Sequence, residues 1–299
     1  MSEPSTLEAQ AARIDAFGQP LLAGLNVSSD APRLALLGDW SPVFRLLAGE
    51  AELSAGVLKV CGVSATEGVQ QGALGLQRLD PSLPNAWSTE QFLGISAELS
   101  GLAPAVARRA VQATVERLGL GSLTGRRLGH LRLAETRALL VAHARLTDPK
   151  ALCLEQPLLG LDTSAEQLLL AVIERAADGR RLLVSLADPE HSAGERELAR
   201  RSDACIRLQA GVAVVENPAA ARVVRVTATV CRNHEAFAAA LAARGLSALP
   251  THEAGLLNSL TSVGTGPAWR YLVELTDGST AGILDAALET EAGLIELNP

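Results

Sequence analysis

Short apolar runs alternate with longer segments of helical periodicity through the first two thirds of the chain. Buried strands are predicted at 21–27, 33–37, 57–60, 151–154, 181–186 and 204–208. Helices are predicted at 41–49, 88–99, 104–118, 134–146 and 164–177. Because continuous apolar runs suit strands that are buried on both faces, this order indicates an α/β domain with a mainly parallel sheet. A helical subdomain is expected at about 88–146.

Two segments show no clear period. Residues 1–16 are polar and rich in alanine, which predicts a short helix or a frayed tail. Residues 70–86 contain Pro81, Pro84 and Asn85 and are expected to form a loop.

The pattern changes near Asn217, where a domain boundary is predicted. Residues 224–230 alternate strictly between apolar and polar positions, as a half-buried strand does. A helix at 235–244, a strand at 269–275, a helix after Asp277-Gly278 and a strand at 294–297 follow. The expected architecture is therefore a domain at 1–216 and a small ferredoxin-like βαββαβ domain at 222–299, with the middle hairpin least well defined by the pattern.

Composition narrows the choice of class. The 299 residues are 48% hydrophobic with a net charge of −7 and a pI near 5.4, which argues against nucleic acid as the main partner. No apolar run approaches the roughly 18 residues of a membrane span, and the N-terminus is not a signal peptide, so a cytosolic protein is expected. Four scattered cysteines and five scattered histidines predict neither a disulfide framework nor a metal site.

Candidate chemistry gathers at ALCLEQPLLGLD, residues 151–162. Glu155 and Gln156 follow a buried strand, at the edge of an open parallel sheet where ligands bind. Asp162 is expected to cap the next helix, with a contact to a partner subunit as the alternative.

Taken in order, residues 17–215 resemble the nucleotide-binding subunit of an ATP-binding cassette (ABC) transporter. The similarity is carried by FGQPLLAGLNVSSDAPRLALLG (17–38), RLLAGEAELSAGVLKVCG (45–62), TEQFLGISAELSGL (89–102) and ARLTDPKALCLEQPLLGLD (144–162). The chain after about 222 is similar to the accessory domain of some ABC-type exporters. The resemblance implies a P-loop NTPase-like fold, MgATP as the family's cofactor and a membrane permease as partner.

The phosphate loop of this family, GxxxxGK[ST], wraps phosphates with backbone N–H groups and neutralises them with lysine. Here Gly38 is followed only by Asp39, Trp40 and Ser41 before Pro42 starts the helix. About four loop residues and the lysine are missing, and Lys59 and Lys150 belong to other segments. Trp40 is expected either to fill the space where nucleotide would lie or to pack on the surface.

The other motifs of the family are altered too. Arg132 stands where the signature serine falls, within Leu131–Glu135, and both signature glycines are absent. Glu155 replaces the Mg²⁺-associated aspartate, and Gln156 replaces the general-base glutamate and cannot accept a proton near neutral pH.

Three further positions follow from the resemblance. Ala187 aligns with the switch histidine, and His191 comes four residues too late. Gln77, or its neighbour Arg78, lies where the family's Q-loop glutamine falls. Phe17 lies where an aromatic residue often stacks on adenine.

These losses predict a catalytically degenerate ABC-type subunit, a pseudo-ATPase, without catalytic or metal-binding residues and with no cofactor expected. Its role would be structural or regulatory, and it would pair with a permease or a second nucleotide-binding subunit, a heterodimer being expected. It would be cytoplasmic and reach the inner face of the membrane only through that partner. The first alternative is an ATPase in a heterodimer that uses MgATP, Glu155 and Arg132. The second is a soluble interaction module.

Overall fold

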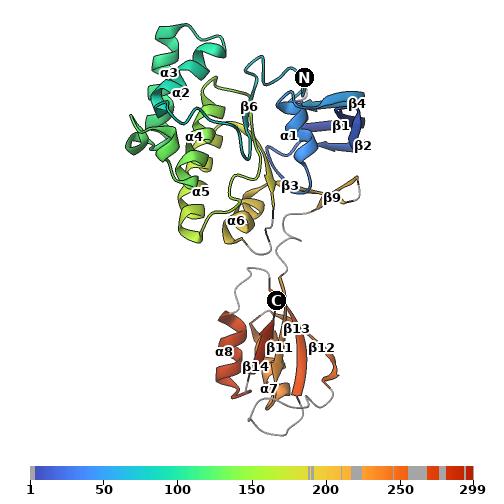
Figure 1. The fold of residues 1–299 in the computed structure, drawn as a ribbon. Helices are drawn as coiled ribbons and strands as arrows, with labels where there is room; N and C mark the ends of the chain where they lie inside the picture. Colours follow the sequence, from blue (N-terminus) through green and yellow to red (C-terminus); the bar gives the residue numbers. More distant parts are fainter. Residues whose placement is uncertain are drawn as a thin grey trace. The chain divides into compact units, whose positions relative to one another are not determined.

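In the computed structural model, a six-stranded sheet forms the centre of the first of two compact units, residues 1–218 (Figure 1). The structure describes residues 4–187, 189, 192–209, 211–216, 224–244, 246–254, 268–275, 281–292 and 294–298. The sheet has the order β10-β9-β3-β8-β7-β6, and its strands are parallel except for β10. Their bounds are β3 Arg33–Gly38, β6 Leu74–Gln77, β7 Ala151–Leu154, β8 Arg181–Leu186, β9 Ala204–Gln209 and β10 Val212–Glu216.

The strands of the central sheet send alternate side chains into two separate cores. Leu37, Leu154 and Val184 point into the core formed with the helices α4 (Leu133–Arg145), α5 (Thr163–Ala177) and α6 (Ala193–Arg201). Leu36 and Cys153 point into the core on the other face. That face is covered by helix α1 (Ser41–Leu47) and by a second, antiparallel sheet (Figure 1). Its strand order is β2 (Gln19–Ser29), β1 (Leu7–Ala16), β4 (Glu52–Val60) and β5 (Val63–Ser64). Since both faces are buried, the strands read as unbroken apolar runs.

The elements around the central sheet complete the first unit. The strands of the antiparallel sheet are β1 Leu7–Ala16, β2 Gln19–Ser29, β4 Glu52–Val60 and β5 Val63–Ser64. The helices are α1 Ser41–Leu47, α2 Thr89–Leu99, α3 Pro104–Leu118, α4 Leu133–Arg145, α5 Thr163–Ala177 and α6 Ala193–Arg201. Short 3-10 turns lie at Gly121–Leu123 and Leu128–His130.

Local sequence signals explain where α2 and α3 begin and end. Ser88 caps α2, because its hydroxyl accepts the Gln91 N–H at 3.1 Å while the Gln91 side chain accepts the Ser88 N–H at 2.8 Å. Pro104 opens α3, and Gly119 ends it in the left-handed conformation, with φ of 72°.

Residues 7–16 form strand β1, so the expectation of a helix or frayed tail at 1–16 is wrong for this segment. Leu7, Ala9, Ala12 and Ile14 are buried, but the register shifts between Ala9 and Ala12, where Ala11 has φ of 46°. This bulge breaks the period of two, and small alanines mark the buried face weakly. The strand is therefore hard to recognise in the sequence.

The expected loop at 70–86 contains strand β6, which is a further correction. A Cβ at Gly75 would lie 1.9 Å from the Ala144 carbonyl oxygen, so this strand packs backbone to backbone against α4. Glycine is needed for the close approach, although in a sequence it reads as a loop residue. Helix α6 and strand β10 were not foreseen either.

The second unit, residues 219–299, is an antiparallel sheet with two helices. Its elements are β11 Val224–Val230, α7 His234–Ala243, β12 Ser247–Ala254, β13 Ala268–Leu275, α8 Ala281–Glu289 and β14 Leu294–Asn298. The strand order β12-β13-β11-β14 is that of a ferredoxin-like βαββαβ fold, as the pattern predicted. Phe237, Leu241, Tyr271, Val273 and Ile283 form its core.

Among the residues described, no helix combines the length and apolar character that crossing a bilayer requires.

Candidate functional site

The candidate site lies at the carboxyl ends of β3, β6, β7 and β8, which are neighbours in the parallel sheet. Gly38, Gln77, Glu155 and Ala187 end or directly follow these strands, so the fold brings the predicted positions to one edge.

The connection from β3 to α1 consists of Asp39 and Trp40 alone. Gly38 has φ of 93°, and a Cβ there would lie 2.4 Å from the Leu208 carbonyl oxygen, so only glycine fits. The Asp39 carboxylate accepts hydrogen bonds from the Ser41 N–H at 3.1 Å and the Ser41 hydroxyl at 2.6 Å. The polar groups at the start of α1 are thus bonded to the protein's own anion.

Trp40 is fully buried in the core between the two sheets, with 0% of its surface exposed. Its indole Nε1–H donates to the Leu37 carbonyl oxygen at 2.9 Å. Of the two expectations for this residue, surface packing is wrong. The side chain fixes the short loop to the core between the two sheets, which also contains Phe44 of α1.

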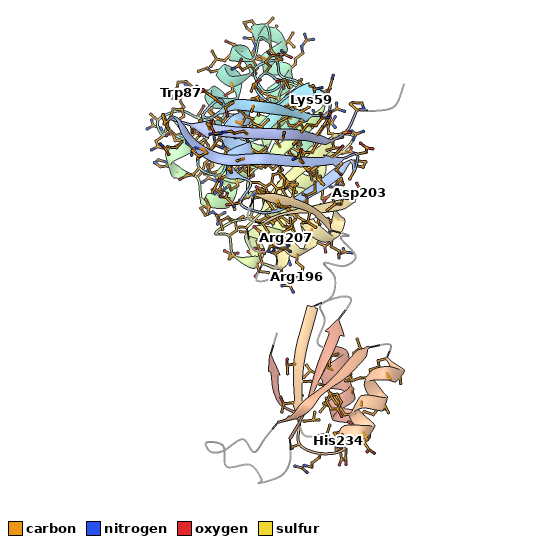
Figure 2. The ribbon with its side chains drawn as sticks, turned by 90° about the vertical axis from the view of Figure 1, so that its right-hand side faces the viewer. Lys59, Trp87, Arg196, Asp203, Arg207 and His234 are labelled. Carbon is orange, nitrogen blue, oxygen red and sulfur yellow. The ribbon has the colours of Figure 1, made fainter. Side chains whose placement is uncertain are left out.

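Neither lysine belongs to this loop. Lys59 lies on β4 of the antiparallel sheet (Figure 2), and Lys150 directly precedes β7, at the opposite end of the central strands. The groups of this loop do not fit a phosphate group, because Asp39 contributes a carboxylate, Pro42 has no N–H and none of residues 38–42 is a cation.

Glu155 at the end of β7 is buried, with 5% of its surface exposed. Its Oε2 atom accepts hydrogen bonds from Arg78 Nε at 2.7 Å and from the Leu79 N–H at 3.0 Å. Arg78 Nη1 also lies 2.6 Å from Oε1 of Glu50. Burial acts to lower the pKa of Arg78, but the bonds to Glu50 and Glu155 outweigh it and raise the pKa above its ordinary value.

Gln77 is 1% exposed, and its amide nitrogen donates to the Arg78 and Glu155 carbonyl oxygens. Its side chain is therefore turned into the protein, and no described group bonds to its Oε1 atom. Gln156 has φ of 40°, and its backbone N–H donates to the Ser185 hydroxyl at 3.0 Å. The amide is not a base, and its backbone is held by the neighbouring strand β8.

Ala187 is exposed directly after β8 and carries no titratable group. His191 lies outside the described residues.

Arg132 occupies the N-cap position of α4, and its side chain is 85% exposed. Its backbone N–H donates to Glu135 Oε2 at 2.8 Å, and its guanidinium lies 3.2 Å from Glu135 Oε1, which also binds Arg126 Nη1 at 2.6 Å. The hydrogen bond from Arg126, followed by that from the Arg132 backbone, lowers the pKa of Glu135 to about 2. Leu133, 46% exposed, stands where the family has glycine.

The remaining two predicted positions have clear local roles. Asp162 caps α5, since its carboxylate accepts the Ala165 N–H at 2.9 Å. Phe17 forms the tip of the β1–β2 hairpin with Gly18, both with positive φ, and is 95% exposed. The structure brings Gln77 into contact with Glu155, but it leaves the side chain of Phe17 facing solvent.

The sequence alone did not reveal the ion pair between Arg78 and Glu50 at this edge. The only local indication was that Arg78, a charged residue, directly follows a strand. Its carboxylate partners lie 28 residues before it and 77 residues after it in the chain, which no local pattern connects.

A depression of about 840 Å³ lies at the opposite edge, lined by residues at or just before the start of the central strands, such as Arg33, Lys150 and Asp203 (Asp203 is labelled in Figure 2). Arg33 there pairs with Glu174 at 2.6 Å, and Arg180 with Asp148 at 2.6 Å. It therefore does not coincide with the candidate site. No cluster of three potential metal ligands occurs among the described residues.

No family model matches the chain. It is 35% identical over 107 residues to the molybdenum import ATP-binding protein ModC of Pseudomonas fluorescens, a match that covers 36% of this chain and 28% of that protein. It is 32% identical over 102 residues to the macrolide export ATP-binding/permease protein MacB 1/2 of Paracoccus denitrificans, covering 33% of this chain and 15% of that protein. The chain thus spans less than a third of the length of these relatives.

Among solved structures, cbiO1 from Clostridium perfringens, part of the ABC transporter complex cbiONQ, is similar with a TM-score of 0.59 at 19% identity. The similarity covers 72% of this chain and 90% of that chain. At this level of identity, the likeness establishes a shared fold.

Proposed function

We infer that this chain, a divergent relative of the ATP-binding subunits of ABC transporters, is a catalytically silent subunit. Its fold is the P-loop NTPase type of those subunits. Its role would be structural or regulatory, within a membrane ABC transporter or a related membrane machine. The fold supports the relationship to ATP-binding subunits. The residues at the ends of the central strands support a silent subunit over a working ATPase.

The connection between β3 and α1 carries the proposal. Two residues join the strand to the helix, and Asp39 occupies the polar groups of Ser41. A phosphate group at this place would meet a carboxylate instead of a lysine, and like charges at short range are unfavourable. MgATP therefore does not fit the residues of this loop.

The expected partners are a membrane permease, a second nucleotide-binding subunit, or both. In the ABC arrangement, each nucleotide lies between the phosphate loop of one chain and the signature segment of the other. Since both segments are altered here, pairing with an intact subunit would leave both composite sites incomplete. The chain would act by its shape, held at the inner face of the membrane through the permease.

Isothermal titration calorimetry of the full chain with MgATP tests the proposal. We expect no binding heat in the micromolar to millimolar range, and the same result with Gln156→Glu, because restoring the base does not restore the phosphate loop. An intact ABC ATP-binding subunit serves as the positive control. Micromolar affinity of the unaltered chain for MgATP would overturn the proposal.

The alternative is an ATPase that works in a heterodimer, using Glu155 for Mg²⁺ and Arg132 for the γ-phosphate. The relatives favour it, since those matched are named ATP-binding proteins. It predicts turnover with the cognate partner that is lost in Glu155→Ala and in Arg132→Ala. Turnover that is unchanged by both substitutions would exclude this use of the two residues.

A soluble interaction module is the third possibility, with the unit at 219–299 recruiting the partner. Purification of the tagged full chain from solubilised membranes separates it from the first two. A permease among the co-purified proteins supports a transporter subunit, whereas soluble partners alone support the interaction module.

A further inference from the structure

The guanidinium of Arg78 lies between two carboxylates that come from different parts of the chain. Its Nε donates to Oε2 of Glu155 at 2.7 Å, and its Nη1 lies 2.6 Å from Oε1 of Glu50. Glu50 follows the end of α1, Arg78 follows β6, and Glu155 follows β7. One cation therefore connects three segments at the edge where the family's chemistry takes place.

Glu155 needs such a cation because it is 5% exposed. A buried carboxylate without compensation is strongly unfavourable, and a guanidinium, which presents N–H groups in several directions, can face two carboxylates at once. Arg137 of α4 adds a second positive charge near Glu155 and Asp80. The Leu79 N–H completes the bonding of Glu155 Oε2.

The same carboxylate stands where the resemblance places the residue that associates with Mg²⁺. A divalent cation bound there would lie against the Arg78 guanidinium, and the two like charges would repel each other in a partly buried site. The negative charge of Glu155 is thus already neutralised by Arg78 of the same chain.

We propose that Arg78 is a built-in cation that takes the place of a divalent metal ion at Glu155 and holds α1, β6 and β7 together without nucleotide. The inference rests on the proposed function, because it describes how a silent subunit keeps the arrangement of its strand ends. The bridge also fixes the start of the segment that leads from β6 into α2, since the backbone of Leu79 is bonded to the same carboxylate.

The test compares Arg78→Gln with the unaltered full chain in thermal unfolding, with and without Mn²⁺. Breaking a buried ion pair should lower the Tm of the first unit by roughly 10 °C. Arg132→Gln is the matched control, because it removes the same charge from an exposed ion pair and should shift the Tm by less than about 2 °C. Equal shifts for the two variants would overturn the proposal.

Metal binding provides the readout that a purely structural role would not change. Mn²⁺ should raise the Tm of Arg78→Gln. The electron paramagnetic resonance signal of free Mn²⁺ should decrease when this variant is added, because Glu50 and Glu155 have lost the Arg78 cation and can bind the metal ion instead. Mn²⁺ should affect neither the unaltered chain nor the double variant Arg78→Gln/Glu155→Gln. The double variant should also recover part of the lost Tm, because its buried carboxylate is gone.

Mn²⁺ binding by the unaltered chain at the affinity of Arg78→Gln would overturn the proposal. If Arg78→Gln does not fold, Arg78→Lys serves in its place. It keeps the positive charge but carries it on a single nitrogen, so it should fold with an intermediate Tm. A Lys variant as unstable as the Gln variant would contradict the role of the charge. If the unaltered chain bound MgATP but not Mn²⁺, the proposed function would be refuted and the role of Arg78 would stand. Failure of the proposed function and failure of this inference can therefore be told apart.

Discussion

Trp40 shows how one residue changes what the β3–α1 connection can do. In a phosphate loop the backbone N–H groups turn toward a ligand, whereas here the residue before α1 sends its side chain into the core. The indole is bonded to Leu37 and packed between two sheets, so the loop is fixed by burial rather than by a ligand. Trp40 therefore stabilises the fold of the first unit.

Trp40→Ala should lower the free energy of unfolding of the first unit by about 3–5 kcal/mol, because it removes a large buried ring and leaves a cavity. Trp40→Phe keeps most of the packing and loses the bond to Leu37, so it should cost about 1–2 kcal/mol. Urea denaturation followed by far-ultraviolet circular dichroism measures both. Recovery of MgATP binding in Trp40→Ala would instead mean that the indole fills a nucleotide site.

Among the elements, α4 begins in a set of internal ion pairs. The Arg132 N–H donates to Glu135, and Arg126 binds the same carboxylate. Leu133 adds an exposed apolar side chain in place of glycine. The helix end is therefore stabilised from within its own chain.

The pKa of Glu135 makes this arrangement testable by pH. Its folded value is about 2 against an ordinary 4.5, with the Arg126 hydrogen bond as the main cause. Because the folded pKa is depressed, the contribution is complete above about pH 5 and is lost as the pH falls toward about 2. We expect a contribution of about 1 kcal/mol, since the side chains of Arg126 and Arg132 are 37% and 85% exposed, so solvent screens both ion pairs.

Glu135→Gln removes the titrating group and keeps an amide that can accept the Arg132 N–H. The difference in unfolding free energy between the unaltered chain and this variant should shrink as the pH is lowered through that window. Glu197, whose pKa is also lowered to about 2 through its bond to Arg200, titrates in both proteins and cancels in the difference. A difference that does not depend on pH would contradict the assignment.

At the scale of the whole molecule, each of the two compact units has a core of its own. The first unit has one core on each face of its central sheet, and the second is built around Phe237 and Tyr271, whose rings lie 5.8 Å apart. Separate cores are the basis for independent folding, and we propose that the units unfold as separate cooperative blocks.

Phe237→Ala should therefore destabilise residues 219–299 by about 3–5 kcal/mol and leave the unfolding of residues 1–218 unchanged. Differential scanning calorimetry of the full chain should show two transitions, of which this variant lowers one and Trp40→Ala the other. A single transition that both variants lower equally would show that the units unfold together.

Much of the fold could be predicted because its signals are local. The runs at 151–154 and 181–186 and the helix at 104–118 have the predicted bounds, since burial on both faces and proline or glycine at the ends leave direct marks in the sequence. β1 and β6 were missed for physical reasons as well. A bulge breaks the alternation of one, and the close approach of Gly75 to α4 gives the other the composition of a loop.

The order of residues alone establishes that neither lysine lies between β3 and α1 and that an amide, Gln156, follows Glu155, because both facts can be read from neighbouring positions. What the groups at the strand ends bind becomes visible only in the folded chain. Glu155 with Arg78, Arg78 with Glu50, and Trp40 with the core between the two sheets are contacts between segments far apart in the chain. Such pairings depend on how strands and helices are stacked, and no local periodicity specifies them.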